Sequence, residues 1–129
     1  MFGGCAYSVQ DLQFKSRTPD TLWDRALSSV EQNCNGIKQA AVERLFISSK
    51  WQAWHTSEGL YLTRCLASFV QEGREVDVRV AFTVRQCPPA DMADLDALAE
   101  YCAVTFNMPE SVAAQLNSAS KKLEFDLRR

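Results

Sequence analysis

The sequence predicts an α+β domain in which helices pack on one face of an antiparallel sheet. Three observations carry this prediction. Residues 76–85, VDVRVAFTVR, alternate between apolar and polar side chains, which is typical of a half-buried strand. Two segments rich in β-forming residues precede them, separated by short turn sequences, and this order predicts a meander. Apolar residues at helical spacing lie on both sides of these strands, and helices on one face of the sheet would bury its apolar side.

The composition is that of an ordinary globular protein. A chain of 129 residues without repeats is long enough for one core, so we assign residues 1–129 to a single domain. Hydrophobic residues make up 47% and charged residues 23%, which argues against disorder. The net charge of −2 argues against a nucleic-acid-binding protein. No apolar run approaches the roughly 18 residues of a membrane span, and residues 1–15 do not resemble a secretion signal, so we expect a cytoplasmic protein.

The cysteines favour the same compartment. An odd number of them without a C-x-x-C motif predicts reduced thiols in the cytosol. With one histidine in the chain, a zinc site would need at least three distant cysteines to converge. We therefore expect neither a metal nor another cofactor. The five cysteines are Cys5, Cys34, Cys65, Cys87 and Cys102.

The elements before the meander are a strand and a helix. Residues 8–14, SVQDLQF, predict a short edge strand. A helix is expected over about 19–33, because Thr18 can cap it and Pro19 suits the first helical position. Gly36 follows where this helix would end. Its apolar stripe, which we expect in the core, is Leu22, Trp23, Ala26, Leu27 and Val30.

The meander is expected to contain strands over about 44–55, 60–71 and 76–86. A four-residue loop, 72–75, would place Gln71 opposite Val76 in the second hairpin. Directly opposed residues share a face of the sheet. The valine face would then gain Thr63, Cys65, Ala67 and Phe69 from the middle strand. The opposite face, which we call the outer face, would carry Arg64, Arg79 and Arg85.

The first hairpin decides where two tryptophans lie. A three-residue loop, 57–59, would place Thr56 opposite Leu60, with Trp51 on the valine face and Trp54 on the outer face. A slip of one residue would exchange the two faces. We prefer the three-residue loop because loops of two or four residues would turn Ser48, Lys50 and Gln52 towards the core.

Two further helices and a final extended segment are expected after the meander. A helix over about 90–106 follows two prolines and has Asp91 and Asp94 in its first turns. A shorter helix over about 109–119 begins at Pro109. Residues 123–127 alternate between apolar and charged side chains, which suggests a last strand or a docked extended segment. Strands at either terminus would extend the meander.

No motif in the sequence predicts a reaction. His55 could act as a general base, but it has no cysteine or serine partner at a motif spacing, so we expect a partly buried sheet histidine. Asp91, Asp94 and Asp96 lack the glycine and distal glutamate of a calcium loop, and helix-start electrostatics explain them. We expect no catalytic residue and no metal ligand.

The outer face is the predicted functional surface. Apolar side chains rimmed by arginines are typical of an interaction site. We therefore expect a non-enzymatic protein-binding module, of the inhibitor, immunity-type, chaperone or adaptor kind, whose partner is another protein or a second copy in a homodimer. The terminal segments, through Phe14, Phe125 and Leu127, could instead cover this face. The candidate partner-binding residues are Trp54, Leu62, Arg64, Leu66, Arg79, Ala81 and Arg85.

Two alternatives belong to other classes of function. The first is a ligand-binding or enzymatic domain with a site near the 55–61 hairpin, formed by His55, Glu58 and Tyr61. The second is a nucleic-acid-binding sheet face on which Trp54 serves as a stacking platform beside the arginines.

Overall fold

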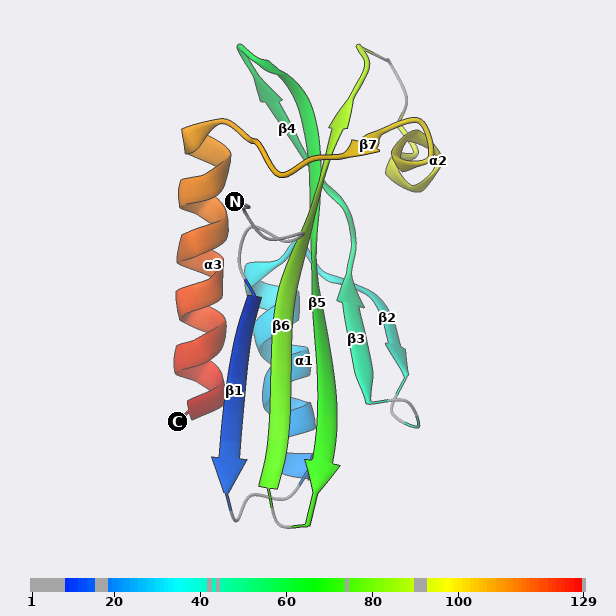
Figure 1. Cartoon of the computed structure of the whole chain (residues 1–129). Helices are drawn as coiled ribbons and strands as arrows, with labels where there is room; N and C mark the ends of the chain where they lie inside the picture. Colours follow the sequence, from blue (N-terminus) through cyan, green and yellow to red (C-terminus); the bar gives the residue numbers. More distant parts are fainter. Residues whose placement is uncertain are drawn as a thin grey trace.

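The protein is an α+β fold with one antiparallel sheet and two long helices on the same side of it (Figure 1). This arrangement confirms the predicted fold class. The two long helices pack against each other as well as against the sheet. The computed structural model describes residues 9–15, 19–41, 43, 45–73, 75–89 and 93–128.

The sheet is larger than the predicted meander. Its main path has the order β1-β6-β5-β3-β2, while β4 also pairs with β5 and β7 with β6. The expected strand over 44–55 is two strands that pair with different parts of β5, whereas the strands expected over 60–71 and 76–86 are confirmed as β5 and β6. The strands are β1 (Val9–Lys15), β2 (Ile37–Ala41), β3 (Phe46–Ser49), β4 (Gln52–Thr56), β5 (Gly59–Glu72), β6 (Glu75–Cys87) and β7 (Ala103–Val104).

The predicted register between β5 and β6 is confirmed. Cys65 lies opposite Phe82, and Phe69 lies opposite Val78. Glu72 pairs with Glu75, so the turn is shorter than the four residues expected, but the register is unchanged. The inner face is the expected valine face, and its residues from β6 are all buried: Val76, Val78, Val80, Phe82 and Val84.

Helix α1 (Pro19–Asn33) agrees with the predicted helix and covers the inner face. Its Trp23 packs against Phe69, with 5.7 Å between the ring centroids, so the expectation of a core tryptophan is confirmed. The second long helix, α3 (Glu110–Arg128), begins as predicted but continues well past residue 119.

The prediction of a final extended segment over 123–127 is wrong, because these residues belong to α3. Leu123 and Leu127 are buried and continue the helical stripe of Val112 and Leu116. Phe125, by contrast, is 67% exposed. The apolar alternation was therefore misleading, because residues four apart share one side of a helix while a residue midway between them faces elsewhere.

The predicted helix over about 90–106 is also wrong. The structure has only α2 (Leu95–Ala99), followed by β7, while residues 90–92 lie outside the described residues. Asp94 caps α2 by accepting hydrogen bonds from the backbone N–H groups of Asp96 and Ala97. The helix stops because a disulfide joins Cys102 to Cys87 and the next residues pair with β6.

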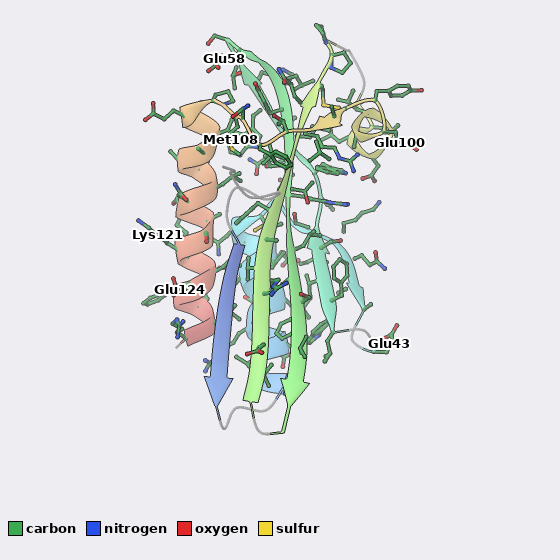
Figure 2. The ribbon with its side chains drawn as sticks, in the orientation of Figure 1. Glu43, Glu58, Glu100, Met108, Lys121 and Glu124 are labelled. Atoms are coloured by element: carbon green, nitrogen blue, oxygen red, sulfur yellow. A yellow bond between two sulfur atoms is a disulfide. The ribbon has the colours of Figure 1, made fainter. Side chains whose placement is uncertain are left out.

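The predicted register of the first hairpin is wrong by one residue. Thr56 lies opposite Gly59, so the turn has two residues, and Trp54 lies opposite Tyr61 on the inner face. Figure 2 shows Glu58 at the tip of this hairpin. Trp51 therefore lies on the outer face, because a shift of one residue in the register exchanges the two faces. The break between β3 and β4 keeps Ile47 on the inner face, opposite Ala67.

Ser49, at the end of β3, is buried, and its hydroxyl is hydrogen-bonded. The buried Ser49 hydroxyl accepts from the backbone N–H of Cys65 at 2.9 Å and donates to the Lys50 carbonyl at 3.0 Å. The burial cost that had favoured a three-residue loop is largely avoided, because Ser48 stays on the outer face, Lys50 is exposed and Gln52 is only partly buried.

Candidate functional site

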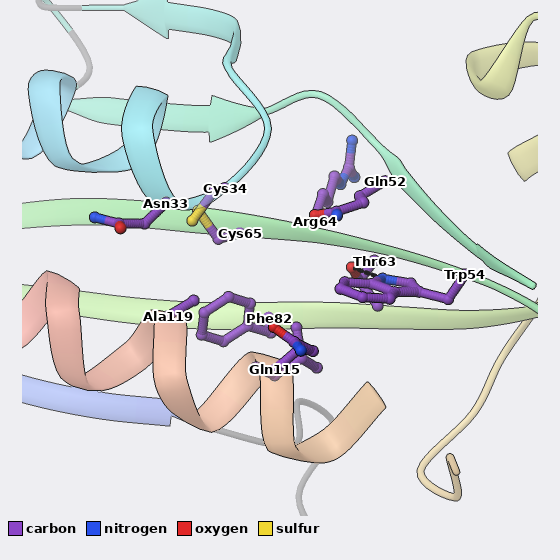
Figure 3. A pocket seen from close by; sticks show the side chains of 11 residues that line it. Asn33, Cys34, Gln52, Trp54, Thr63, Arg64, Cys65, Phe82, Gln115 and Ala119 are labelled. Atoms are coloured by element: carbon purple, nitrogen blue, oxygen red, sulfur yellow. Dashed lines mark hydrogen bonds between the residues drawn. The ribbon is translucent and has the colours of Figure 1, made fainter. Parts of the chain in front are cut away.

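Six of the seven predicted partner-binding residues lie on the outer face, on β5 and β6, as expected from their register. Trp54 does not. Its indole N–H donates to the Thr63 hydroxyl at 2.8 Å on the inner face, where the ring is half-buried against the core (Figure 3). The tryptophan of the outer face is instead Trp51, which the sequence analysis assigned to the valine core.

A small cluster of apolar residues covers one end of the outer face. Trp51 is only 5% exposed, and Leu62 is completely buried. They pack with Leu98 and Ala99 of α2, and with the cysteines of the disulfide. We call this group, with Leu60, the Trp51 cluster. It divides the outer face into a covered end beneath α2 and an open end beyond it.

The Cys87–Cys102 disulfide holds this cover in place. It joins the end of β6 to the turn after α2, with 4.3 Å between the Cα atoms. The prediction that all cysteines are reduced is therefore wrong for this pair, whereas Cys34 and Cys65 are free and buried. Nothing in the spacing of 15 residues marks a disulfide, and the pairing depends on where α2 ends.

Two arginines lie against the Trp51 ring. The guanidinium carbon of Arg64 lies 4.4 Å from the ring centroid and that of Arg85 lies 5.2 Å from it. Arg85 also donates to the Ala99 carbonyl at 2.7 Å. Burial lowers the pKa of Arg64, and the charge of Arg85 lowers it further. The Nε atoms of both arginines are buried without a hydrogen-bond partner, which shows that holding them here has a cost.

A pocket of about 320 Å³ opens beside Trp51. Its polar lining comes from Asn35, Lys38 and Lys50 on one side and from the start of α2 on the other. Lys38 forms an ion pair with Asp96 at 2.7 Å, and this contact raises the lysine pKa although the group is solvent-exposed. The pocket therefore lies between β2 and α2, next to the covered end of the outer face.

The open end of the outer face has no described helix over it, since α1 and α3 lie on the opposite side of the sheet (Figure 1). Val70 is 54% exposed there, and Arg79 is exposed as well. The prediction that the segment containing Phe125 and Leu127 could cover this face is wrong, because α3 packs on the inner side. The side chain of Phe14 lies outside the described residues.

The inner face contains a second, smaller cavity of about 120 Å³ (Figure 3). Asn33, Gln52 and Gln115 contribute amides to its lining, and Cys34 and Cys65 contribute thiols. A hydrogen bond to Cys65 and burial raise the pKa of the Cys34 thiol, so it is a poor nucleophile. Ligand pockets usually exceed about 300 Å³, so this cavity is small for a substrate site.

The hairpin site of the enzymatic alternative is not assembled. His55 is exposed on the outer side, whereas Tyr61 is buried on the inner side. The expectation of a partly buried histidine is therefore wrong. Within the described ranges, no group of three or more histidine, cysteine or carboxylate side chains could hold a metal ion. None of the helices described has the length and apolar character needed to cross a membrane.

Comparisons with known proteins give little further information. No protein-family model matches the chain, and no curated protein matches it. Among solved structures, it is similar to a DUF4468 family protein from Bacteroides ovatus, with 9% sequence identity and a TM-score of 0.42. The match covers 95% of this chain and 84% of that one. A likeness at this level carries no argument about function.

Proposed function

We propose that the chain is a small non-enzymatic protein-binding module that acts through the open end of its outer sheet face. One observation supports the proposal: β5 and β6, 14 and 13 residues long, are covered by helices on one side, whereas no described helix lies over much of the other side, which is the bare part of the sheet. The bare part combines exposed Val70 with partly exposed Leu66 and Ala81, and Arg79 lies among them. An apolar surface with a polar rim is typical of an interaction site.

The charge of this face suggests the chemistry of the partner. Of the described side chains on the outer face of β5 and β6, Arg64, Arg79 and Arg85 are cationic, while only Asp77 is anionic. We infer that the partner is a protein with an acidic surface, because complementary charge steers association. Inhibitors, immunity-type proteins, chaperones and adaptors all act through such surfaces, whereas a homodimer through this face alone would bring the arginines of two copies together.

The compartment is a separate part of the proposal. The sequence favours the cytoplasm, whereas a disulfide such as Cys87–Cys102 is typical of proteins in oxidising compartments. We therefore propose that the module works outside the reducing cytosol. Thiol titration of protein isolated from its native host under acid-quenched conditions would test this. A fully reduced Cys87–Cys102 pair would contradict it.

Site-specific photocrosslinking tests the binding surface. A benzophenone amino acid at Ser68, on the open outer face, should give a discrete crosslinked product in the native host. The same group at Ser118, exposed on α3, is the matched control and should give none. Adding Val70→Asp should abolish the product from position 68. Crosslinks from both positions, or from neither, would contradict the proposal, and a product of twice 14.5 kDa would identify a homodimer.

The nucleic-acid alternative has less support. It retains Arg64, Arg79 and Arg85 on one face but loses its aromatic platform, because Trp54 lies on the inner face and Trp51 is 5% exposed. Base stacking needs an accessible ring. Binding of single-stranded DNA whose affinity falls steeply with salt would favour this alternative over the protein-binding one.

A further inference from the structure

Three cations gather around Trp51 without a carboxylate that neutralises them. Arg64 and Arg85 lie against the ring, and Lys50 lines the pocket beside it. None of the three forms an ion pair within the part of the chain that the structure describes. Arg64 also makes no side-chain hydrogen bond there, whereas Arg85 uses one nitrogen to reach the Ala99 carbonyl.

The two carboxylates that line the pocket are already engaged. Asp96 binds Lys38 at 2.7 Å, and both residues line the pocket. Asp94 accepts two backbone N–H groups at the start of α2. The charge of Asp96 acts on Arg64 only at a distance, and it is the weakest of the three influences on its pKa. Among the described residues, no carboxylate is therefore paired with Lys50, Arg64 or Arg85.

The sheet brings the two guanidinium groups together. Arg64 lies opposite Thr83 and Arg85 lies opposite Leu62, so the arginines are diagonal neighbours on one face of β5 and β6. Diagonal neighbours are within reach of each other when their side chains are long. Contact with the same indole restricts both groups, so less conformational freedom would be lost when a ligand binds. Two like charges this close repel each other, and an anion between them would offset the repulsion.

We propose that Lys50, Arg64 and Arg85 form a binding site for an oxyanion, the group that a carboxylate or a phosphate carries. Guanidinium groups bind both anions through paired N–H···O hydrogen bonds. The 320 Å³ pocket on the Lys50 side of Trp51, which is lined by Asp94 and Asp96 but by neither arginine, provides room for the rest of a small ligand or of a side chain, including cationic groups on it. This site is at the covered end of the outer face, and it does not depend on a protein partner at the open end.

Titration of the isolated protein with inorganic phosphate and with acetate tests the site. The side-chain Nε–Hε signals of arginine, observed by ¹⁵N NMR, should shift saturably for Arg64 and Arg85. The signal of Arg128, which is paired with Glu124 on α3, provides the internal control and should not saturate. Sodium chloride at equal ionic strength separates binding from screening. Tighter binding of phosphate would indicate a phosphoryl ligand, and tighter binding of acetate would indicate a carboxylate.

Substitutions make the test specific. Arg64→Gln should weaken binding at least tenfold, and Arg64→Lys should restore part of it. Arg79→Gln, on the same face but outside the cluster, should have no effect. If Arg64→Gln does not fold, as judged by its amide spectrum, the exposed Lys50→Gln should still weaken binding about threefold. Linear shifts of equal size at all arginines, or binding that survives both Arg64→Gln and Lys50→Gln, would overturn the proposal.

Discussion

Trp51 and Trp54 are three positions apart and lie on opposite faces of the sheet. Trp51 is buried beneath α2 on the outer face, while Trp54 donates to the Thr63 hydroxyl on the inner face. An odd separation along a strand gives this result, since successive side chains point to opposite faces. The two rings therefore belong to different clusters, and their contributions to stability can be measured separately.

Trp51→Ala should lower the free energy of unfolding by about 3–5 kcal/mol, because it empties the centre of the Trp51 cluster. Trp54→Phe keeps a ring but removes the hydrogen bond to Thr63, so it should cost about 1 kcal/mol. Urea denaturation of both variants checks these values. Equal losses would mean that Trp51 is not the better-packed ring.

Removing the disulfide should destabilise the protein by about 3 kcal/mol, as expected for a closed loop of about 15 residues. The variant is Cys87→Ala with Cys102→Ala, measured by urea denaturation with and without dithiothreitol. The reductant should lower the stability of the natural sequence by a similar amount and leave the double variant unchanged. An equal response of both proteins to dithiothreitol would show that the bond does not contribute.

The buried Cys34 thiol should make stability depend on pH in the alkaline range. The hydrogen bond to Cys65, together with burial, raises the pKa of Cys34 in the folded protein above its ordinary value. Below the thiol pKa of the unfolded chain, about 8.5, this contribution to stability is fully present. Above it the unfolded chain releases a proton that the folded protein keeps, so stability should fall by up to about 1.4 kcal/mol per pH unit.

Denaturation at pH 7.5 and 9.5 measures this fall, and Cys34→Ala should reduce it. The folded protein should also resist thiol reagents at Cys34 and Cys65, both of which are buried. Rapid labelling of Cys65 without denaturant would contradict its position on the inner face.

Ser49→Ala should cost about 1–3 kcal/mol, because it leaves the buried N–H of Cys65 without an acceptor. Ser57→Ala, in the exposed turn of the first hairpin, is the control and should be nearly neutral. Thermal unfolding of the two variants distinguishes them. Similar melting temperatures would show that water replaces the Ser49 hydroxyl.

His55→Ala should change stability by no more than about 0.5 kcal/mol, since the side chain is exposed. It should also leave partner binding intact, because the residue lies away from the open outer face. Loss of activity in the host with an unchanged melting temperature would instead favour the enzymatic alternative.

Local patterns predicted the parts of the fold that local forces determine. The strict alternation of residues 76–85, together with a turn of even length, was sufficient to place Arg64 and Arg85 on the outer face. To place the tryptophans, the loop of the first hairpin had to be predicted to within one residue. Loops of two and of three residues both allow a glycine with positive φ at position 59. This difference of one residue in loop length determined which tryptophan lies beside the arginines.

Long-range interactions explain the other differences. The 90–106 segment has a helical pattern, but the disulfide and the pairing of β7 with β6 end the helix early, and neither is visible in local sequence. Leu123 and Leu127 fit a strand or a helix equally well, and their burial against the inner core decides for the helix.

The hydrogen bond between Ser29 and Asp126, 2.6 Å long, joins residues 97 positions apart. It has a consequence for folding during synthesis. Residues 46–87 contain the hairpins of β4, β5 and β6 and can pair as soon as they emerge, whereas α1 must wait for α3 before both of its packed sides are covered. Contacts between such distant segments form slowly. The nascent chain therefore presents one side of α1 uncovered until α3 has left the ribosome, and this interval is when the chain is most open to chaperones or to aggregation.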